Sequence, residues 1–206
     1  MRESAFKDKS ARVGLLAKLP EGAELAPTRL ALKLLMEGYD HAVKQEKRLR
    51  QELTRLAKKE EVVVRLTELP GVAWVRAATL FVYLDTPWRF ASKQALWKYI
   101  GIGLVRQTSG DGPEHLGVNP AANRALKSMI LGAAESAILQ GDNPFAEQHR
   151  RWRDDGLSPR NARRNVARSL ASVMWGMWKN GGAYDPERVH AKASEKVESN
   201  GSRSDR

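Results

Sequence analysis

The stretch that decides the fold is LPGVAWVRAATLFVYLDTPWRFASKQALWKYIGIGLVRQTSG, residues 69–110. It opens with a Pro-Gly break, because proline and glycine interrupt helical patterns. An apolar helical pattern follows over residues 72–84, and Asp-Thr-Pro stops it. Ser92 can cap a helix over residues 93–100, which Gly101 ends. The stretch therefore predicts short helices that are separated by tight turns.

The rest of the chain is also helical in pattern, and strand-like alternation is scarce. The β-rich run VVVRL at residues 62–66 lies inside a helical pattern. The sequence therefore predicts an all-α fold: a long coiled-coil helical arm, then a compact multi-helix domain with a helix-hairpin-helix-like element. The expected parts are an irregular N-terminal remnant (1–27), the arm (28–66), the domain (67–188) and a disordered tail (189–206). Within the domain, helices are expected over 121–139, 144–154 and 159–179, and a polar loop over 105–120.

The arm is predicted from a heptad pattern that follows Pro27-Thr28, since proline suits the first turn of a helix. Its seam consists of Leu35, Tyr39, Ala42, Leu49, Leu53, Leu56 and Val63, with Glu46 and Glu60 as polar interruptions. Such a helix would span about 57 Å, which is more than a small core needs. One interpretation is an ordinary helix packed on its own domain. The other, which we expect, is an arm that forms a homo-oligomer or an antiparallel hairpin.

Composition restricts the class of protein. The chain has no cysteine, so disulfide frameworks, zinc knuckles and cysteine nucleophiles are excluded. No apolar run approaches a membrane span, and the charged N-terminus does not resemble a signal peptide. We therefore expect a soluble cytoplasmic protein with no membrane partner. Lys and Arg number 35 against 24 Asp and Glu, a net charge of +11, which favours DNA as the partner and association with the nucleoid.

The basic excess includes a row of arginines near the C-terminus. The cluster consists of Arg150, Arg151, Arg153, Arg160, Arg163, Arg164 and Arg168. Arg160, Arg164 and Arg168 are spaced by four residues and share one helix face, with Arg163 beside them. Phosphate contact is the natural use of such a row, so these four are candidate DNA-binding residues. The alternative is an ordinary solvated helix face.

The Pro-Gly break itself resembles a helix-hairpin-helix motif of DNA-repair proteins. In that motif a tight turn aims backbone N–H groups at a phosphate, and small residues let the second helix pack closely. Gly71 and Arg76 are the candidate DNA-binding residues here, and Ala73 stands where the motif has its second glycine. The alternative interpretation is a structural helix break.

The loop Arg106-Gln107-Thr108-Ser109-Gly110-Asp111-Gly112 could carry chemistry. A hydroxyl in a glycine-rich loop can approach a phosphate, and Arg106 could stabilise the charge that develops during attack. The alternative is simple turn chemistry. The acidic residues form no spaced carboxylate set of a metal-dependent nuclease.

The order of these motifs resembles the C-terminal domain of insertion-sequence 110 family transposases, which include Piv-type DNA invertases. The matching residues are Leu69-Pro70-Gly71, Ala77-Ala78-Thr79-Leu80, Phe90-Ala91-Ser92, Tyr99-Ile100-Gly101, Arg106, Gln107, Ser109, Gly110, Asn123-Arg124, Asn143-Pro144-Phe145, Val166-Ala167-Arg168 and Gly181-Gly182. The similarity covers residues 66–187 and extends to the arm. It adds Arg124 to the candidate DNA-binding residues.

The resemblance implies a recombinase in which Ser109 is the nucleophile, Thr108 is its neighbour, and a structured guide RNA serves some members. It also implies an N-terminal RuvC-like domain that holds Mg²⁺. We expect this domain to be missing before the arm, with Asp8 as the remnant of its final acidic motif. Residues 113–119 lack the family's basic run. We therefore expect a truncated transposase that binds no cofactor itself and is inactive alone. The alternative is a non-catalytic DNA-binding or dimerising module, a regulator or a relic.

Overall fold

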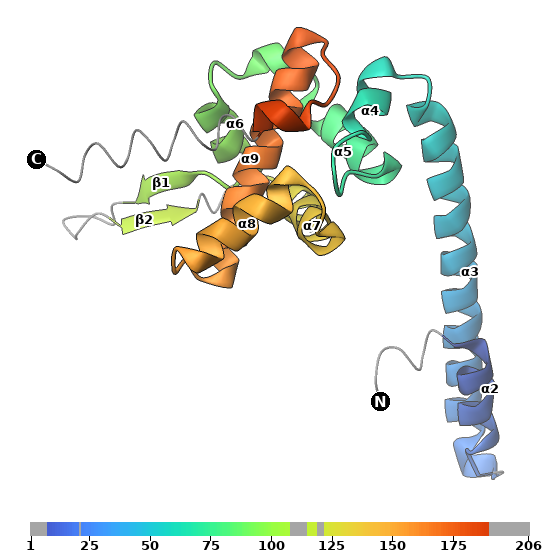
Figure 1. Ribbon diagram of the computed structural model, residues 1–206. Helices are drawn as coiled ribbons and strands as arrows, with labels where there is room; N and C mark the ends of the chain where they lie inside the picture. The colour runs from blue at the N-terminus through green and yellow to red at the C-terminus, as the bar shows by residue number, and fades with distance from the viewer. Residues whose placement is uncertain (1–7, 21, 108–114, 119–121, 190–206) are drawn as a thin grey trace, which may run out of the picture. The chain divides into compact units, whose positions relative to one another are not determined.

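The computed structural model describes residues 8–20, 22–107, 115–118 and 122–189 (Figure 1). It confirms the all-α class, because its elements are helices apart from one two-stranded sheet. The chain divides into two compact units, Met1–Glu52 and Leu53–Arg206. In the described ranges, no helix is long and apolar enough to cross a membrane. The predicted disordered tail lies outside the described residues from residue 190 onward.

The first unit contains helix α2 (Lys9–Ala17), the 3-10 helix η1 (Ala23–Leu25) and most of helix α3 (Ala26–Ala57). The sequence predicts an irregular segment here, whereas α2 forms because Asp8 caps it. The Asp8 carboxylate accepts hydrogen bonds from the N–H and the hydroxyl of Ser10, both at 2.8 Å, and these bonds lower the pKa of Asp8. Asp8 therefore serves as a helix cap.

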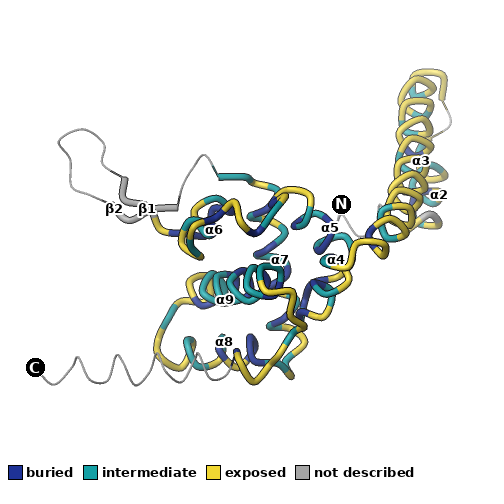
Figure 2. Tube along the Cα trace, turned by 90° about the horizontal axis from the view of Figure 1, so that it is seen from above, coloured by how far each residue is buried: buried dark blue, intermediate teal, exposed yellow. Residues whose placement is uncertain are grey.

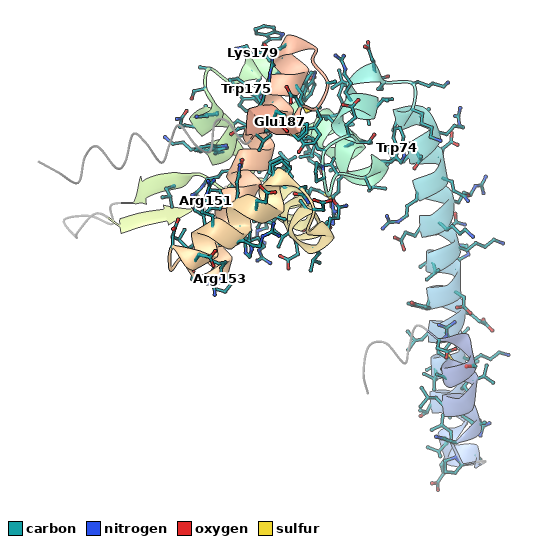
Figure 3. All side chains as sticks on the ribbon, in the orientation of Figure 1. Trp74, Arg151, Arg153, Trp175, Lys179 and Glu187 are labelled. Atoms are coloured by element: carbon teal, nitrogen blue, oxygen red, sulfur yellow. The ribbon has the colours of Figure 1, made fainter. Side chains whose placement is uncertain are left out.

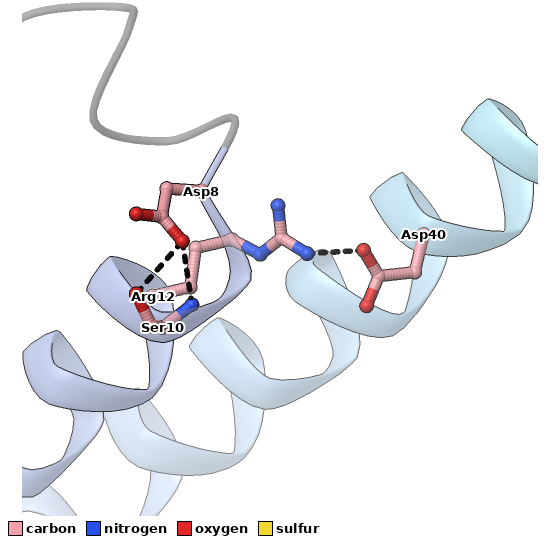
Figure 4. Close-up of polar contacts among 4 residues, drawn as sticks. All are labelled: Asp8, Ser10, Arg12 and Asp40. Atoms are coloured by element: carbon pink, nitrogen blue, oxygen red, sulfur yellow. Dashed lines mark hydrogen bonds and ion pairs between the residues drawn. The ribbon is translucent and has the colours of Figure 1, made fainter.

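A buried arginine joins α2 to α3 in this unit. The guanidinium of Arg12 forms an ion pair with the carboxylate of Asp40 and lies 4.9 Å from the centre of the Tyr39 ring (Figure 4). The Arg12 side chain is 4 % exposed, so its charge is largely removed from water and the Asp40 carboxylate compensates it. Arg29 adds a 2.8 Å hydrogen bond to the Leu19 carbonyl oxygen. These contacts fix a short antiparallel helix pair.

The apolar seam predicted along α3 is largely exposed in the chain. Leu35 is 66 % exposed and Leu49 is 68 % exposed. Figure 2 shows α3 mostly in the colour of exposed residues. Of the two interpretations of the arm, the structure does not bear out a helix that buries this seam within its own unit.

The arm is shorter than the sequence predicts. Helix α3 ends at Ala57, and a separate helix α4 spans Glu61–Leu66. Val63 and Leu66 of α4 are buried in the core of the second unit, where α4 packs against later helices. The burial of these two side chains favours a separate α4 over a continuation of α3 through residues 58–60.

The second unit is built around its longest helix, α9 (Pro159–Asn180). The elements are α4, α5 (Trp74–Leu84), the 3-10 helix η2 (Pro87–Arg89), α6 (Lys93–Ile100), β1 (Leu104–Gln107), β2 (His115–Val118), α7 (Arg124–Gln140), α8 (Pro144–Asp154) and α9 (Pro159–Asn180). Helix α9 packs against α4, α6, α7, α8 and η2 (Figure 1). Its buried stripe consists of Ala162, Val166, Leu170 and Met174, spaced by four residues.

A β-hairpin replaces the polar loop predicted over residues 105–120. Strand β1 pairs antiparallel with β2, with Leu104 opposite Val118 and Gln107 opposite His115. The prediction of a loop is wrong at both ends of that range. Neither short segment shows strong apolar alternation, and seven residues separate the strands instead of a two-residue turn. Local sequence signals therefore missed the pairing.

Candidate functional site

A compact turn after α6 leads into the hairpin. The Trp97 carbonyl oxygen accepts hydrogen bonds from the backbone N–H groups of Gly101, Ile102 and Gly103, at 3.0, 2.9 and 2.9 Å. Gly101 has a φ of +85°, and a Cβ at Gly103 would lie 2.8 Å from the Lys98 nitrogen. Side chains at either glycine would open the turn. This turn sets where strand β1 begins.

Arg168 of α9 forms a hydrogen bond to the backbone of this turn. Its Nε donates to the Ile102 carbonyl oxygen at 2.7 Å, and its Nη1 donates to Asn165 Oδ1 at 2.9 Å. The Arg168 carbonyl oxygen accepts a 3.1 Å hydrogen bond from the Trp97 indole. Burial and the nearby charge of Arg164 lower the pKa of Arg168. Arg168 therefore uses much of its hydrogen-bonding capacity within the protein.

The other three arginines of the predicted row differ in their partners. Arg163 Nη1 lies 2.9 Å from Glu135 Oε2, which gives an ion pair between α9 and α7. Arg164 is half-buried, and burial together with Arg160 and Arg163 lowers its pKa. In the described part of the chain, neither Arg160 nor Arg164 is paired with a carboxylate. These two cations are available to an external anion.

Two arginines of α8 from the same predicted cluster make local contacts. Arg150 Nη1 donates to the Gly141 carbonyl oxygen at 3.1 Å, and Arg153 Nη1 donates to the Leu157 carbonyl oxygen. Figure 3 shows Arg153 on α8 with Arg151 on the same helix. Arg150 and Arg153 therefore donate hydrogen bonds to backbone carbonyl oxygens that lie outside α8, one before the helix and one after it.

The predicted helix-hairpin-helix turn is formed by residues 69–72. The Val72 N–H donates to the Leu69 carbonyl oxygen at 3.0 Å, and Gly71 has a φ of +77°. Proline followed by a positive-φ glycine is typical of a type II turn. A Cβ on Gly71 would lie 2.1 Å from the Ala133 carbonyl oxygen and 2.7 Å from the Ala137 nitrogen. Gly71 is therefore needed where the turn packs onto the backbone of α7.

Arg76 ties the same turn to α7. Its Nη1 donates to the Gly71 carbonyl oxygen at 2.7 Å and to Ser136 Oγ at 2.9 Å. An open groove beside it is lined by residues 67–74, Arg76, Ser136 and Gln140. The first turn of α5 faces this region without a side-chain cap at Ala73. Arg76 thus has a structural role in addition to the DNA contact predicted for it.

Of the candidate catalytic residues, Arg106 lies on a described element. Arg106 lies on β1 opposite Leu116, and its side chain is outside the described part. Ser109 and Thr108 lie outside the described residues altogether. Arg124 is exposed at the start of α7, where the Asn123 side chain caps the helix.

Cations approach the base of this hairpin from two helices. The hairpin-base turn packs against Ala122, two residues before Arg124 at the start of α7, since a Cβ on Gly101 would lie 2.4 Å from the Ala122 Cβ. On the α9 side, Arg164 precedes Arg168 by one helical turn, and Arg168 bonds Ile102 in the turn. Cations of two helices therefore lie near the turn at the base of the hairpin.

The described residues include no cluster of side chains that could ligate a metal ion. Across residues 8–20, 22–107, 115–118 and 122–189, no group of three or more His, Cys, Asp or Glu side chains could hold a metal ion. These residues therefore do not fit a magnesium site, and no step proposed for this chain passes through one.

Sequence reasoning missed an aromatic and cationic cluster in the second unit. Lys179 Nζ lies 4.9 Å from the ring centres of both Trp88 and Trp175. Figure 3 shows Trp175 and Lys179 toward the end of α9. The signal was the four-residue spacing of Trp175 and Lys179 on one helix face, but Trp88 comes from η2 and only the fold brings it there.

Residues 63–150 match the family described as Transposase IS116/IS110/IS902 family. This finding agrees with the resemblance read from the sequence: over these residues the chain is similar to that transposase family.

The chain is also similar to a curated protein. The chain is 27 % identical over 183 residues to a protein of Sinorhizobium fredii that is described as "Putative transposase y4pF/y4sB". The alignment covers 87 % of this chain and 46 % of the relative. The chain thus spans about half the length of the curated relative that it matches.

Proposed function

We propose that this chain acts in DNA transposition as the DNA-binding C-terminal part of a transposase. The observation that carries the proposal is Arg164, a half-buried arginine whose pKa is lowered by burial and by Arg160 and Arg163. Holding like charges together at a partly desolvated site costs free energy, which a bound anion would return. The DNA backbone supplies such anions at regular spacing.

The neighbourhood of Arg164 supports a role near the reacting phosphate. One helical turn further along α9, Arg168 bonds the Ile102 carbonyl oxygen at the base of the hairpin. A phosphate held by Arg160 and Arg164 would therefore lie on the side of α9 that bonds the base of the hairpin. Arg124 of α7 would add a contact from the other side, and the same cations could hold the phosphates of a structured guide RNA.

In the proposed chemistry, Ser109 is the nucleophile. Its Oγ attacks a phosphodiester phosphorus, a P–O bond to serine forms, and the P–O bond to the departing sugar oxygen breaks. The serine proton ends on that sugar oxygen, and Arg106 steadies the charge on the phosphate. One phosphate ester replaces another, so the step needs no energy-rich cofactor and can be reversed during strand exchange.

The arm would assemble copies of the chain. Leu35 and Leu49 are mostly exposed on α3, which supports pairing of this helix with a second one as a coiled coil. Two copies would bring two basic surfaces to two DNA ends, as strand exchange requires. The helix-hairpin-helix-like turn would add a sequence-independent backbone contact at the groove beside Arg76.

Fluorescence anisotropy with a short DNA duplex at several salt concentrations tests the proposal. The double variant Arg160→Glu and Arg164→Glu should weaken binding strongly and reduce the salt slope by about two, because each phosphate contact contributes about 0.9. The matched control is Arg188→Glu, whose side chain is 83 % exposed and pairs with Asp185. Equal effects of the variant and the control would contradict the assigned surface.

The serine assignment separates the enzyme from a non-catalytic module. A RuvC-like domain of the family, supplied in trans or fused, should allow a covalent protein–DNA product. Ser109→Ala should abolish that adduct and Thr108→Ala should leave it, since only one hydroxyl forms the ester. An adduct that persists in Ser109→Ala would identify another nucleophile. If the wild-type chain forms no adduct with the supplied domain, the non-catalytic module is favoured.

A further inference from the structure

A second surface on the same unit combines indole rings with an unneutralised cation. We call it the indole surface and define it by Trp88 of η2 together with Trp175 and Lys179 of α9. Trp88 is 69 % exposed, although tryptophan is the largest side chain available to a core. Lys179 lies about 22 Å along α9 from Arg164, so this surface is separate from the arginine surface proposed above.

The position of the indole surface is fixed by backbone contacts. The Trp175 indole N–H donates to the Pro87 carbonyl oxygen at 2.7 Å, which joins α9 to the residue before Trp88. The Thr86 hydroxyl accepts a 3.4 Å hydrogen bond from the Trp88 N–H and caps η2. Lys179 Nζ then lies 4.9 Å from both ring centres. Because these contacts already hold the side chains in place, a ligand that stacks on Trp88 would bind at little cost in conformational entropy.

A second aromatic–cation pair lies in the next segment. The Arg89 guanidinium is 4.8 Å from the centre of the Tyr99 ring, and the Tyr99 hydroxyl donates to the Tyr83 carbonyl oxygen at 3.3 Å. Among the described residues, neither Lys179 nor Arg89 forms an ion pair with a carboxylate. Asp85 is the acidic residue of this segment. The local charge is thus positive beside open aromatic faces.

These features together select a ligand that is both anionic and flat. We propose that the indole surface binds single-stranded DNA, with an unpaired base stacked on Trp88 and its phosphates beside Lys179 and Arg89. A duplex hides the faces of its bases, so an exposed indole adds nothing to duplex binding. An apolar protein surface would gain from Trp88 but would have to desolvate two cations without an anion in return. This inference stands apart from the duplex contacts of Arg160 and Arg164.

The test compares a fluorescein-labelled dT15 strand with a 15-bp duplex, using the full chain. Trp88→Ala should weaken dT15 binding by about tenfold, because base–aromatic stacking contributes strongly to single-strand affinity. Duplex affinity should stay within about twofold of the wild type. Trp88→Phe keeps an aromatic face and should retain most of the dT15 affinity. Because the Trp88 side chain is largely exposed, helical circular dichroism should not change.

Salt dependence distinguishes the stacking ring from the cation. Lys179→Gln should lower the salt slope of dT15 binding by about 0.7, the contribution of one phosphate on a single strand. Trp88→Ala should leave that slope unchanged, since a ring releases no counterions. A slope that falls in Trp88→Ala, or stays constant in Lys179→Gln, would overturn the assigned roles.

Other outcomes overturn the proposal itself. These are a wild-type chain that does not bind dT15, a Trp88→Ala variant that binds it as the wild type does, and equal losses on dT15 and duplex. Tighter, Trp88-dependent binding of rU15 would make RNA the ligand instead of DNA. A change of molecular mass in light scattering for Trp88→Ala would make the surface a protein interface. Loss of duplex binding in the Arg160 and Arg164 variant bears only on the other surface.

Discussion

The Nε atom of Arg168 donates a 2.7 Å hydrogen bond to the carbonyl oxygen of Ile102, 66 residues earlier in the chain. Ile102 lies two residues before strand β1, which leads toward Ser109. An arginine that looks like a free phosphate ligand in the sequence is therefore committed to the base of the hairpin. Arg164, one turn before it, makes no hydrogen bond of this kind among the described residues.

Arg168→Ala should destabilise the protein and loosen the hairpin. Loss of charge-assisted hydrogen bonds to the Ile102 carbonyl and to Asn165 should cost about 1.5–3 kcal/mol, measured by urea unfolding. Hydrogen exchange of the amides in 104–107 should become faster. Arg164→Ala is the control, with little change in stability but weaker duplex binding. Unchanged exchange in Arg168→Ala would show that the hairpin does not depend on this contact.

Gly71→Ala should be far more damaging than Gly141→Ala. Both glycines have positive φ, +77° and +78°, so both substitutions carry the backbone strain of about 1–2 kcal/mol. At Gly71 the new Cβ would collide with backbone, 2.1 Å from the Ala133 carbonyl oxygen. A Cβ added at Gly141 would meet no atom within 4 Å outside its own chain neighbours. Thermal unfolding of the two variants measures the difference. Similar melting temperatures would mean that the turn can move away from α7 at little cost.

Leu49→Lys should convert an assembled protein to a monomer. Leu49 is 68 % exposed in the first unit, and a lysine on a coiled-coil seam would be desolvated without a partner. Leu53 is less suited to this test because it packs against the core of the second unit. Light scattering gives the mass, with Leu139→Lys as the control, since Leu139 is exposed on α7. A wild-type chain that is monomeric at high concentration would exclude self-assembly through the arm.

Asp85→Gly should stabilise the protein. Asp85 has φ +65° and ψ −60°, and the Thr86 N–H donates to the Leu84 carbonyl oxygen across it at 2.7 Å. This γ-turn is strained for a residue with a Cβ, by about 1–3 kcal/mol, and glycine relieves the strain. The greater freedom of glycine in the unfolded chain offsets part of the gain. Asp155→Gly, at φ −71°, offers no such relief and should lower the melting temperature instead.

The sequence predicted the helices that carry strong local start signals. Asn143-Pro144 and Ser158-Pro159 place a capping side chain before a proline, and α8 and α9 begin at those prolines. The break after Ala57 was missed because it depends on burial of Val63 and Leu66 against helices distant in sequence. The β-hairpin was missed for a related reason, since the hydrogen bonds between β1 and β2 depend on both segments and neither segment alone has a strong strand pattern.

The candidate site was predicted in its residue types but not in their roles. Four-residue spacing placed Arg160, Arg164 and Arg168 on one face, yet it could not separate Arg168, which bonds a distant carbonyl, from the other two. Likewise, Gly71 and Arg76 were singled out for DNA contact, while their packing against α7 depends on Ala133 and Ser136. Such assignments need the partner atoms, which lie on other elements.

The contact between Gly71 and α7 also limits how this protein can diverge. The backbone of the turn at Gly71 touches α7 at Ala133 and Ala137, and both alanines are fully buried. The nearest atoms of α7 are backbone atoms, so no side-chain substitution on α7 could make room for a Cβ at position 71. Relatives that keep this turn should therefore keep glycine at that position, and another residue there would mark a relative in which the turn has moved away from α7.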